Sequence, residues 1–155
     1  MPIFSRHWIS PQTNLPDPNR LRVQGAALQV EISVPQQLAA ALQQAQQPIP
    51  APQVGIAIID TGASITCVDD AVLQGLGLTP SNTVPVATPS ATSVDQPVYA
   101  CVISFPGTPI GPLPFSTVIG SQLAGLGCIA LIGRDVLQFC QLVYNGPEGF
   151  WTIAF

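Results

Sequence analysis

A carboxylate at the end of an apolar run is the feature of this chain that could do chemistry. The run from Val54 to Ile59 has the composition of a β-strand and leads directly into Asp60-Thr61-Gly62-Ala63-Ser64. An unpaired charge is costly to bury, so a carboxylate delivered by an apolar strand is typical of sites that share a proton or shift its ionisation. The alternative is a strand followed by an Asx-type turn, in which Asp60 only caps exposed amides.

A second apolar segment near the C-terminus is interrupted in a similar way. Leu131-Ile132-Gly133-Arg134-Asp135-Val136-Leu137 is a strand-like run broken by a glycine and a charged pair. Taken with Ile58 to Ser64, this segment resembles the retropepsin family of aspartic proteases, and the resemblance covers roughly residues 21–155. It implies an all-β acid protease barrel with one or two short helices and one lobe per chain.

The resemblance also implies an active site made by two subunits. Each retropepsin subunit supplies one catalytic Asp, whereas the bilobal pepsin-like enzymes carry two Asp-Thr/Ser-Gly segments in one chain. This chain carries one, at Asp60. Peptide hydrolysis needs both a base to activate water and an acid for the leaving nitrogen, and two close carboxylates that share one proton supply both. We therefore expect an aspartic endopeptidase that acts as a homodimer on an extended peptide or protein substrate.

The residues around Asp60 take supporting roles by the same resemblance. The Thr61 hydroxyl would bond to the other subunit, the Gly62 amide would donate toward the carboxylate, Ala63 would line the floor of the cleft, and Ser64 would contact the substrate backbone. Arg134 and Asp135 match the Gly-Arg-Asp element beneath the active site. From their residue types we interpret this adjacent pair as a structural ion pair, which supports the site without catalysing the reaction.

Two further parts of the family's architecture can be placed in the sequence. The flap over the substrate corresponds to Val86 to Val94, with Thr88, Pro89, Ser90 and Ala91 at its tip, and it lacks the glycine of the viral pattern. The dimer contact corresponds to the closing hairpin, for which we expect Phe150, Trp151, Ile153 and Phe155 as apolar anchors. A target protein is not indicated.

Composition excludes several other classes of protein. Charged residues make up 8% of the chain and apolar ones 47%, and the formal net charge is −4. A nucleic-acid-binding face needs clustered Lys and Arg, but the chain has no lysine and four scattered arginines. So few charges favour burial of further surface in an oligomer.

The sequence predicts no membrane span, metal or cofactor. No apolar segment approaches the roughly 20 residues of a membrane helix, and the first residues lack the apolar core of a secretory signal. The cysteines, Cys67, Cys101, Cys128 and Cys140, are widely spaced in apolar surroundings, so we interpret them as reduced core residues and not as zinc ligands. We expect a cytoplasmic, free-standing cellular or bacterial protein.

The chain divides into an arm and one domain. Residues 1–19 hold four prolines and little periodicity, and they predict an irregular N-terminal arm. Residues 20–155 form the retropepsin-like domain, with strand character from Leu21 to Val34. Residues 35–53 form an insertion, in which Leu38, Leu42 and Ala45 share one helical face, although the glutamines there are also typical of a flexible linker.

The rest of the domain alternates short strands with turns. Asp69 and Asp70 are interpreted as the cap and first turn of a short helix, and not as an acid–base pair. Residues 79–97 are a polar stretch rich in Pro, Ser and Thr. Strands are then expected at 98–105, 115–119 and 127–132, before a hairpin that turns at residues 145–149.

Two functions other than proteolysis stay open at this level. The same fold can serve as a non-catalytic peptide-binding or dimerisation module, although such a module has no need of a buried carboxylate. The chain can also be a structural subunit in which Asp60 caps a turn.

Overall fold

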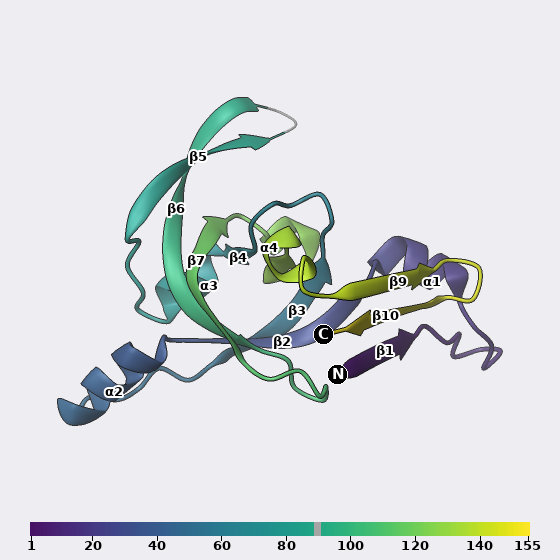
Figure 1. Cartoon of the computed structure of the whole chain (residues 1–155), viewed down its shortest axis with the longest axis horizontal. Coiled ribbons are helices and arrows are strands. Elements are labelled where there is room, and N and C mark those ends of the chain that lie inside the picture. The colour runs from purple at the N-terminus through teal and green to yellow at the C-terminus, as the bar shows by residue number, and fades with distance from the viewer. Residues whose placement is uncertain (89–90) are drawn as a thin grey trace.

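The computed structural model describes residues 1–88 and 91–155, which form two sheets and several short helices (Figure 1). The larger sheet has the strand order β2-β3-β8-β4-β7-β6-β5, and β2 also pairs with β6, so that all its strands except β5 form a closed ring. Its strands are β2 (Ala27–Ser33), β3 (Gln53–Ile59), β4 (Cys67–Asp69), β5 (Asn82–Thr88), β6 (Ala91–Ser104), β7 (Leu113–Ser121) and β8 (Ala130–Ile132). The expected all-β fold with few short helices is confirmed.

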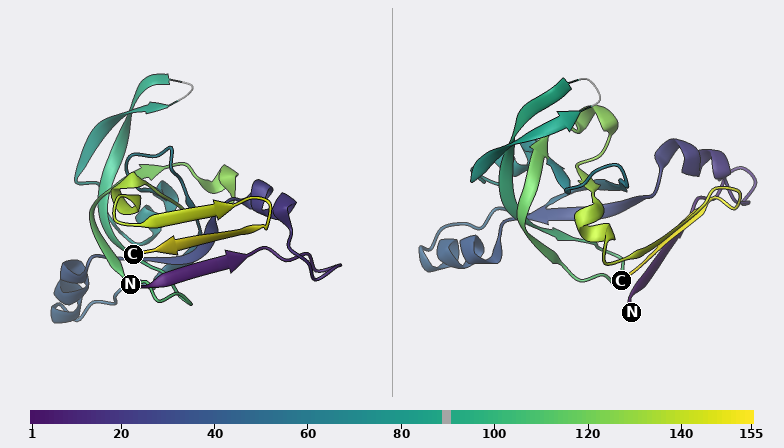
Figure 2. Two further views of the ribbon diagram at one scale, coloured as in Figure 1. Left: turned by 45° about the vertical axis from the view of Figure 1, so that its right-hand side comes forward. Right: turned by 45° about the horizontal axis from the view of Figure 1, so that its top comes forward.

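The second sheet joins the two ends of the chain. Its order is β1-β10-β9, from β1 (Ile3–His7), β10 (Phe150–Ala154) and β9 (Gln141–Asn145), and both pairings are antiparallel. The closing hairpin β9–β10 is thereby confirmed. Figure 2 shows α1 (Pro18–Gln24) on one face of this sheet, and no described segment in front of the other face.

Two parallel pairings determine where the two sequence motifs meet. β3 runs parallel to β8 with Ile59 opposite Ile132, and β4 runs parallel to β7. Parallel neighbours end at the same edge of a sheet, so the residues that follow them emerge side by side. Asp60 follows Ile59 and Gly133 follows Ile132. Sequence segments far apart in the chain are therefore brought together by sheet register.

Alternation of apolar and polar residues builds the core from the inner faces of the strands. In β2, Val30 and Ile32 are fully buried whereas Gln29 is exposed. The apolar strand β3 is buried only in its second half, since Val54 and Ile56 are 57% and 38% exposed. The parallel pairing with β8 begins only at Ala57, which leaves the first half of β3 at the surface.

The N-terminal arm is not irregular, contrary to the expectation for residues 1–19. β1 pairs along its full length with β10, and Trp8 is 4% exposed. The guanidinium groups of Arg6 and Arg20 lie 4.3 and 4.8 Å from the centroid of the Trp8 ring. The pairing of β1 with β10 joins residues more than a hundred positions apart, so no local pattern in the arm could predict its order.

The expected strand character from Leu21 was also wrong, because α1 occupies residues up to Gln24. Asp17 Oδ1 accepts a hydrogen bond from the Arg20 amide at 2.9 Å, and Pro18 occupies the first helical turn. The strand expected from this region therefore begins only at Ala27.

The helix of the insertion is confirmed, and so is the helix after Asp69. α2 spans Gln36–Gln44 between β2 and β3 and projects from the body of the molecule (Figure 1). α3 spans Asp70–Gly75, with Asp69 Oδ1 accepting from the Ala71 amide at 3.0 Å. No helix in the described chain is long and apolar enough to cross a bilayer.

The polar stretch 79–97 folds as part of a long hairpin, which its composition did not indicate. β5 pairs antiparallel with β6 from Asn82↔Val98 to Thr88↔Ala91, with an irregularity near Thr88. Pro85 is tolerated there because β5 is an edge strand with one side free of pairing. Two further helical segments were not expected: η1 (Ala124–Leu126), which comes just before the strand predicted at 127–132, and α4 (Arg134–Leu137).

Candidate active site

Asp60 lies in the turn that follows β3, with its side chain partly exposed. Its amide donates to the Ile132 carbonyl at 2.9 Å, which anchors the start of the turn on β8. Its Oδ1 atom accepts from the Gly62 amide at 2.8 Å. Among the described residues no donor contacts the other carboxylate oxygen. Asp60 thus combines a fixed orientation with one oxygen free to bond a further group.

Arg134 stabilises the turn around Asp60 through hydrogen bonds to its backbone carbonyls. Arg134 Nη1 donates to the Thr61 carbonyl at 2.9 Å and contacts the Gly62 carbonyl at 3.4 Å, while the Arg134 amide donates to the Ala63 carbonyl at 2.9 Å. These bonds satisfy the backbone acceptors of a loop that has no strand partner. The guanidinium therefore positions the turn that carries Asp60.

Asp135 is bonded to the chain segment that leaves the turn. Its Oδ2 accepts from the Thr66 amide at 2.9 Å, and its Oδ1 accepts from the Thr66 hydroxyl at 2.8 Å and from the Val136 amide at 3.0 Å. In residues 1–88 and 91–155 no ion pair joins Arg134 to Asp135, because each side chain is bonded to a different part of the turn. The expected ion pair is wrong.

Thr66 is the residue that sequence reasoning missed. It is fully buried, and its hydroxyl donates to Asp135 while accepting from the Gly133 amide at 3.1 Å. The available signal was a single hydroxyl residue inside the apolar run from Ile65 to Val68. A buried hydroxyl needs hydrogen-bond partners, and the Gly-Arg-Asp segment supplies them.

Gly133 allows the two segments to approach closely. A Cβ atom at this position would lie 2.8 Å from the Ile65 carbonyl carbon and 2.9 Å from the Thr66 nitrogen. Both contacts are to backbone, which cannot rotate away. The glycine of the Gly-Arg-Asp element is thus required by packing against the segment that follows the Asp60 turn.

The remaining residues of the turn stay near the surface. Thr61 and Ser64 are exposed and Ala63 is partly buried. Within the described part of the chain, the Thr61 hydroxyl makes no hydrogen bond. Their expected roles toward a second subunit and a substrate remain predictions.

Asp69 and Asp70 are bonded away from the turn, as their interpretation as helix-capping residues requires. Asp69 is 7% exposed, and its Oδ2 accepts from the Leu123 amide at 2.8 Å. Asp70 Oδ1 accepts from the Tyr99 hydroxyl at 2.6 Å. Both carboxylates therefore connect α3 to neighbouring elements.

The hairpin β5–β6 contains the residues predicted to form a flap. It projects from the closed sheet and curves over the side of the molecule that carries the loop between β3 and β4 (Figures 1 and 2). Val86 pairs with Val94 in its outer part. Of the four predicted tip residues, Pro89 and Ser90 lie outside the described residues, while Thr88 and Ala91 end the two strands.

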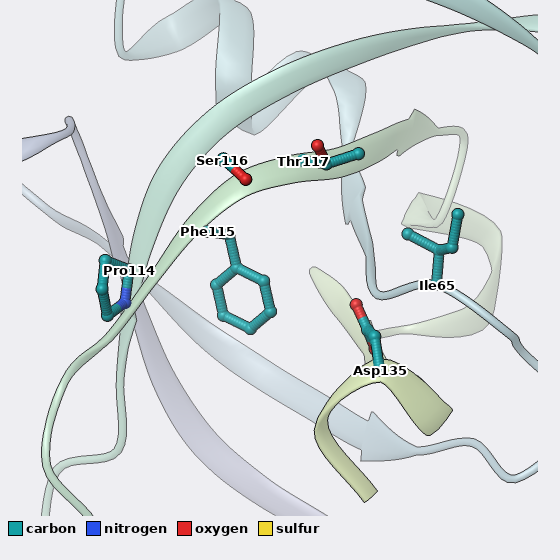
Figure 3. Close-up of a pocket in the computed structure, with 6 residues that line it drawn as sticks. All are labelled: Ile65, Pro114, Phe115, Ser116, Thr117 and Asp135. Carbon is teal, nitrogen blue, oxygen red and sulfur yellow. The ribbon is translucent and has the colours of Figure 1, made fainter. Parts of the chain in front are cut away.

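A groove beside β7 adjoins the segment that follows the Asp60 turn. It has a volume of about 360 Å³ and is lined by Ile65, Pro114, Phe115, Ser116, Thr117 and Asp135 (Figure 3). β4 pairs with β7 only at Ile119 to Ser121, so the part of β7 that lines the groove has one unpaired edge. Asp60 does not line this groove.

The pKa of the Cys67 thiol depends on the charges of the nearby carboxylates. Burial raises the pKa of its thiol, a hydrogen bond with Ser121 opposes this, and the negative charges of Asp60 and Asp135 raise the pKa further. Its thiol donates to the Ile65 carbonyl at 3.5 Å. Within the described residues, no group of three or more His, Cys, Asp or Glu side chains is arranged to hold a metal.

The geometry places the turn from Asp60 to Ser64 directly on the Gly-Arg-Asp segment within a closed sheet, the arrangement that the sequence resemblance implies. The fold is retropepsin-like.

Comparison with known proteins gives similarities to solved structures only. No family model and no curated protein sequence matches the chain. The solution structure of the simian foamy virus (mac) protease is similar with 20% identity and a TM-score of 0.45, over 73% of this chain and 92% of that one. The crystal structure of a retropepsin-like aspartic protease from Rickettsia conorii is similar with 11% identity and a TM-score of 0.43, over 97% of this chain and 90% of that one.

Proposed function

We propose that this chain is an aspartic endopeptidase, in which the Asp60 carboxylates of two identical subunits activate one water molecule. One observation carries the proposal: Asp60 is fixed by the Gly62 amide at 2.8 Å on a turn held by Arg134, and its second oxygen is free of donors in the described chain. The turn is fixed by the pairing of β3 with β8 and by the Arg134 guanidinium. A carboxylate that only capped the turn would not need this support.

The proposed reaction divides acid and base work between the two carboxylates. The ionised carboxylate takes a proton from water, and the water oxygen bonds to the scissile carbonyl carbon. The protonated carboxylate gives its proton to the carbonyl oxygen, which forms a gem-diol. The C–N bond then breaks as a proton passes to the nitrogen and the diol becomes a carboxylic acid. A single Asp60 cannot hold both roles at once, so the site needs a second copy.

The surrounding residues would fix this pair and its substrate. The free Thr61 hydroxyl is available to bond to the other subunit, and the Gly62 amide sets the plane of the carboxylate. We assign Ala63 to the floor of the cleft and Ser64 to the substrate backbone. An extended peptide would lie between the turn and the β5–β6 hairpin, held by main-chain hydrogen bonds as an added strand.

The cysteines support a reducing cellular compartment, and we propose the cytoplasm. Cys67, Cys101, Cys128 and Cys140 are all free thiols, and Cys101 and Cys128 are buried. Disulfides rather than free thiols are usual in small domains of oxidising compartments.

The testing experiment compares cleavage of an unbiased peptide library by the wild type and by Asp60→Asn. Products are read by mass spectrometry from about pH 4 to pH 8, the range in which paired carboxylates and their neighbours change protonation. Glu148→Gln is the matched control, because it removes an exposed carboxylate in the turn between β9 and β10. We expect cuts by the wild type and the control that disappear in Asp60→Asn.

Two outcomes would contradict this proposal. Cuts that persist in Asp60→Asn would exclude Asp60 as the catalytic group. No cuts by any variant at any pH would favour the non-catalytic peptide-binding or dimerisation module.

A further inference from the structure

The two hairpins of the chain are attached to the rest of the molecule in different ways. In the closing hairpin β9–β10, Trp151 and Ile153 are 0% and 2% exposed, so they are interior residues of one chain. The expectation that these two residues anchor a dimer is wrong. The hairpin β5–β6 extends away from the closed ring of strands, and β5 pairs with β6 alone (Figure 1). Its position therefore depends on what holds its base.

The base of the β5–β6 hairpin lies at Val98 and Tyr99. Exposure falls along β6 from 39% at Val94 to 5% at Val98 and 1% at Tyr99. The pairing of β6 with β7 begins at Val98, opposite Ile119, so in the described chain the outer part of β6 has β5 as its only neighbouring strand. These two residues therefore mark the boundary between a two-stranded hairpin and the closed sheet.

A hydrogen bond joins this base to α3. Tyr99 Oη donates to Asp70 Oδ1 at 2.6 Å, and Gln74 Nε2 donates to Asp70 Oδ2. Gly120 leaves room for the pair, because a Cβ atom there would lie 2.7 Å from Tyr99 Cε2 and 2.8 Å from Asp70 Oδ1. In residues 1–88 and 91–155, no other hydrogen bond between two side chains links β5 or β6 to another element.

Asp70 is in turn fixed relative to the turn that carries Asp60. β4 follows that turn and pairs with both β7 and β8. Asp69 ends β4 and directly precedes α3, and its Oδ2 accepts from the Leu123 amide at 2.8 Å. The backbone between the turn and Asp70 is thus held on both sides. The bond from Tyr99 to Asp70 therefore relates the position of the hairpin to that of Asp60.

We propose that Tyr99 and Asp70 are positioning residues, whose hydrogen bond holds the β5–β6 hairpin over the Asp60 turn in the orientation that binds a peptide. This inference rests on the proposed function, in which the peptide lies between the turn and this hairpin. Without the bond, only backbone at its base would hold the hairpin. Its contacts with the peptide would then weaken in the bound substrate and in the transition state alike, which raises KM and leaves kcat nearly unchanged.

The first test measures cleavage kinetics on a peptide that the wild type cuts. Tyr99→Phe keeps the buried ring and removes only the hydroxyl, and we expect about a tenfold rise in KM for it and for Asp70→Ala. Both variants remove the same bond, so the double variant should show the same rise as either one. Asp70→Asn keeps an acceptor and should recover part of KM. Tyr144→Phe is the matched control, because the Tyr144 hydroxyl donates to the Leu21 carbonyl at 3.0 Å, and Tyr144 belongs to the other sheet.

The second test does not depend on cleavage. NMR relaxation dispersion detects motion of individual backbone amides on the microsecond to millisecond timescale. In Tyr99→Phe we expect such motion at the amides of the β5–β6 hairpin, and no change from the wild type in β2 and β3. A hydrogen bond that only stabilised the fold would lower the melting temperature without motion confined to the hairpin.

The outcomes separate this inference from the proposed function. Wild-type cleavage that depends on Asp60, with an unchanged KM in Tyr99→Phe, would leave the function standing and overturn the inference. A rise in KM for the double variant equal to the product of the two single rises would also overturn it, because the two residues would then act separately. So would motion that increases equally in the hairpin and in β2 and β3. Hairpin motion in Tyr99→Phe without any cleavage by the wild type would support the hold of Tyr99 on the hairpin and remove the function.

Discussion

Asp60 and Asp135 follow two parallel strands at the same edge of one sheet, yet their carboxylates are bonded very differently. Asp135 accepts from the Thr66 amide, the Thr66 hydroxyl and the Val136 amide, all within 3.0 Å. Asp60 accepts from the Gly62 amide alone. The residue type is shared, but Asp60 directly follows β3 whereas Asp135 lies in α4, and the two carboxylates meet a different number of donors.

The difference indicates how a fold separates carboxylates that join protein segments from one that keeps an oxygen available. A carboxylate whose oxygens are occupied by protein donors stabilises the segments that supply them, and it has few lone pairs left for water. Asp69 and Asp70 also belong to the occupied group, through Leu123 and Tyr99. Asp60 is oriented by one donor and keeps an oxygen for further bonds. We therefore expect a change at Asp135 to lower mainly stability, and a change at Asp60 to lower mainly activity.

The largest stability effect is expected for Asp135→Ala. This change leaves the buried Thr66 amide and hydroxyl without their acceptor, which costs about 3 kcal/mol of unfolding free energy. Asp60→Ala should cost at most about 0.5 kcal/mol, because it removes one hydrogen bond at a partly exposed turn. Urea denaturation of both variants measures the difference. Equal losses would contradict the distinction between the two carboxylates.

Gly133→Ala tests whether the backbone at Gly133 must pack closely against the backbone at Ile65 and Thr66. The new methyl group would lie within 3 Å of backbone at Ile65 and Thr66, so we expect a loss of about 2 kcal/mol. Gly125→Ala is the control, because a Cβ there meets nothing within 4 Å. A thermal melt of each variant reports the loss. If Gly133→Ala is as stable as the control, the close approach is not rigid.

Arg134→Met separates positioning from stability. Arg134 is exposed, so removal of its bonds to the Thr61 and Gly62 carbonyls should cost less than about 1 kcal/mol. If cleavage depends on the orientation of Asp60, kcat should fall about tenfold with little change in KM. Arg134→Lys keeps a donor for these carbonyls, so it should recover part of kcat. A residue that only stabilised the fold would not give this partial recovery of kcat. An unchanged kcat in Arg134→Met would remove Arg134 from the support of the site.

The parts of the fold that were predictable have local signals. The alternation in β2, the cap at Asp69 and the closing hairpin each depend on neighbouring residues, and the structure has all of them. The strand β1 has no such signal, since it is ordered by pairing with β10 at the other end of the chain. β5 was not predicted because its polar residues and Pro85 are typical of a loop, and a proline within a strand is tolerated at the edge of a sheet.

The candidate site also has residues that could be predicted from the sequence and contacts that could not. Asp60 and the Gly-Arg-Asp segment were visible as charged or glycine residues that interrupt apolar strands. Their partners were not, because the bonds of Arg134 to Thr61 and of Asp135 to Thr66 span 73 and 69 positions. An adjacent Arg-Asp pair suggests an ion pair in sequence, but the register of β3 against β8 presents each side chain with a different acceptor or donor.

The smallest expected effect reports on the charge of the two carboxylates directly. Burial raises the pKa of the Cys67 thiol, and the charges of Asp60 and Asp135 raise it further, against a hydrogen bond from Ser121. Removing either charge should lower this pKa, so more thiolate is present at a fixed pH near 8 and alkylation is faster. We expect about a twofold rise in the iodoacetamide rate at Cys67 for Asp60→Asn and for Asp135→Asn. Mass spectrometry resolves Cys67 from the other cysteines, and Glu148→Gln controls for net charge. A rise for Asp135→Asn without one for Asp60→Asn would contradict the effect of the Asp60 charge on the Cys67 thiol.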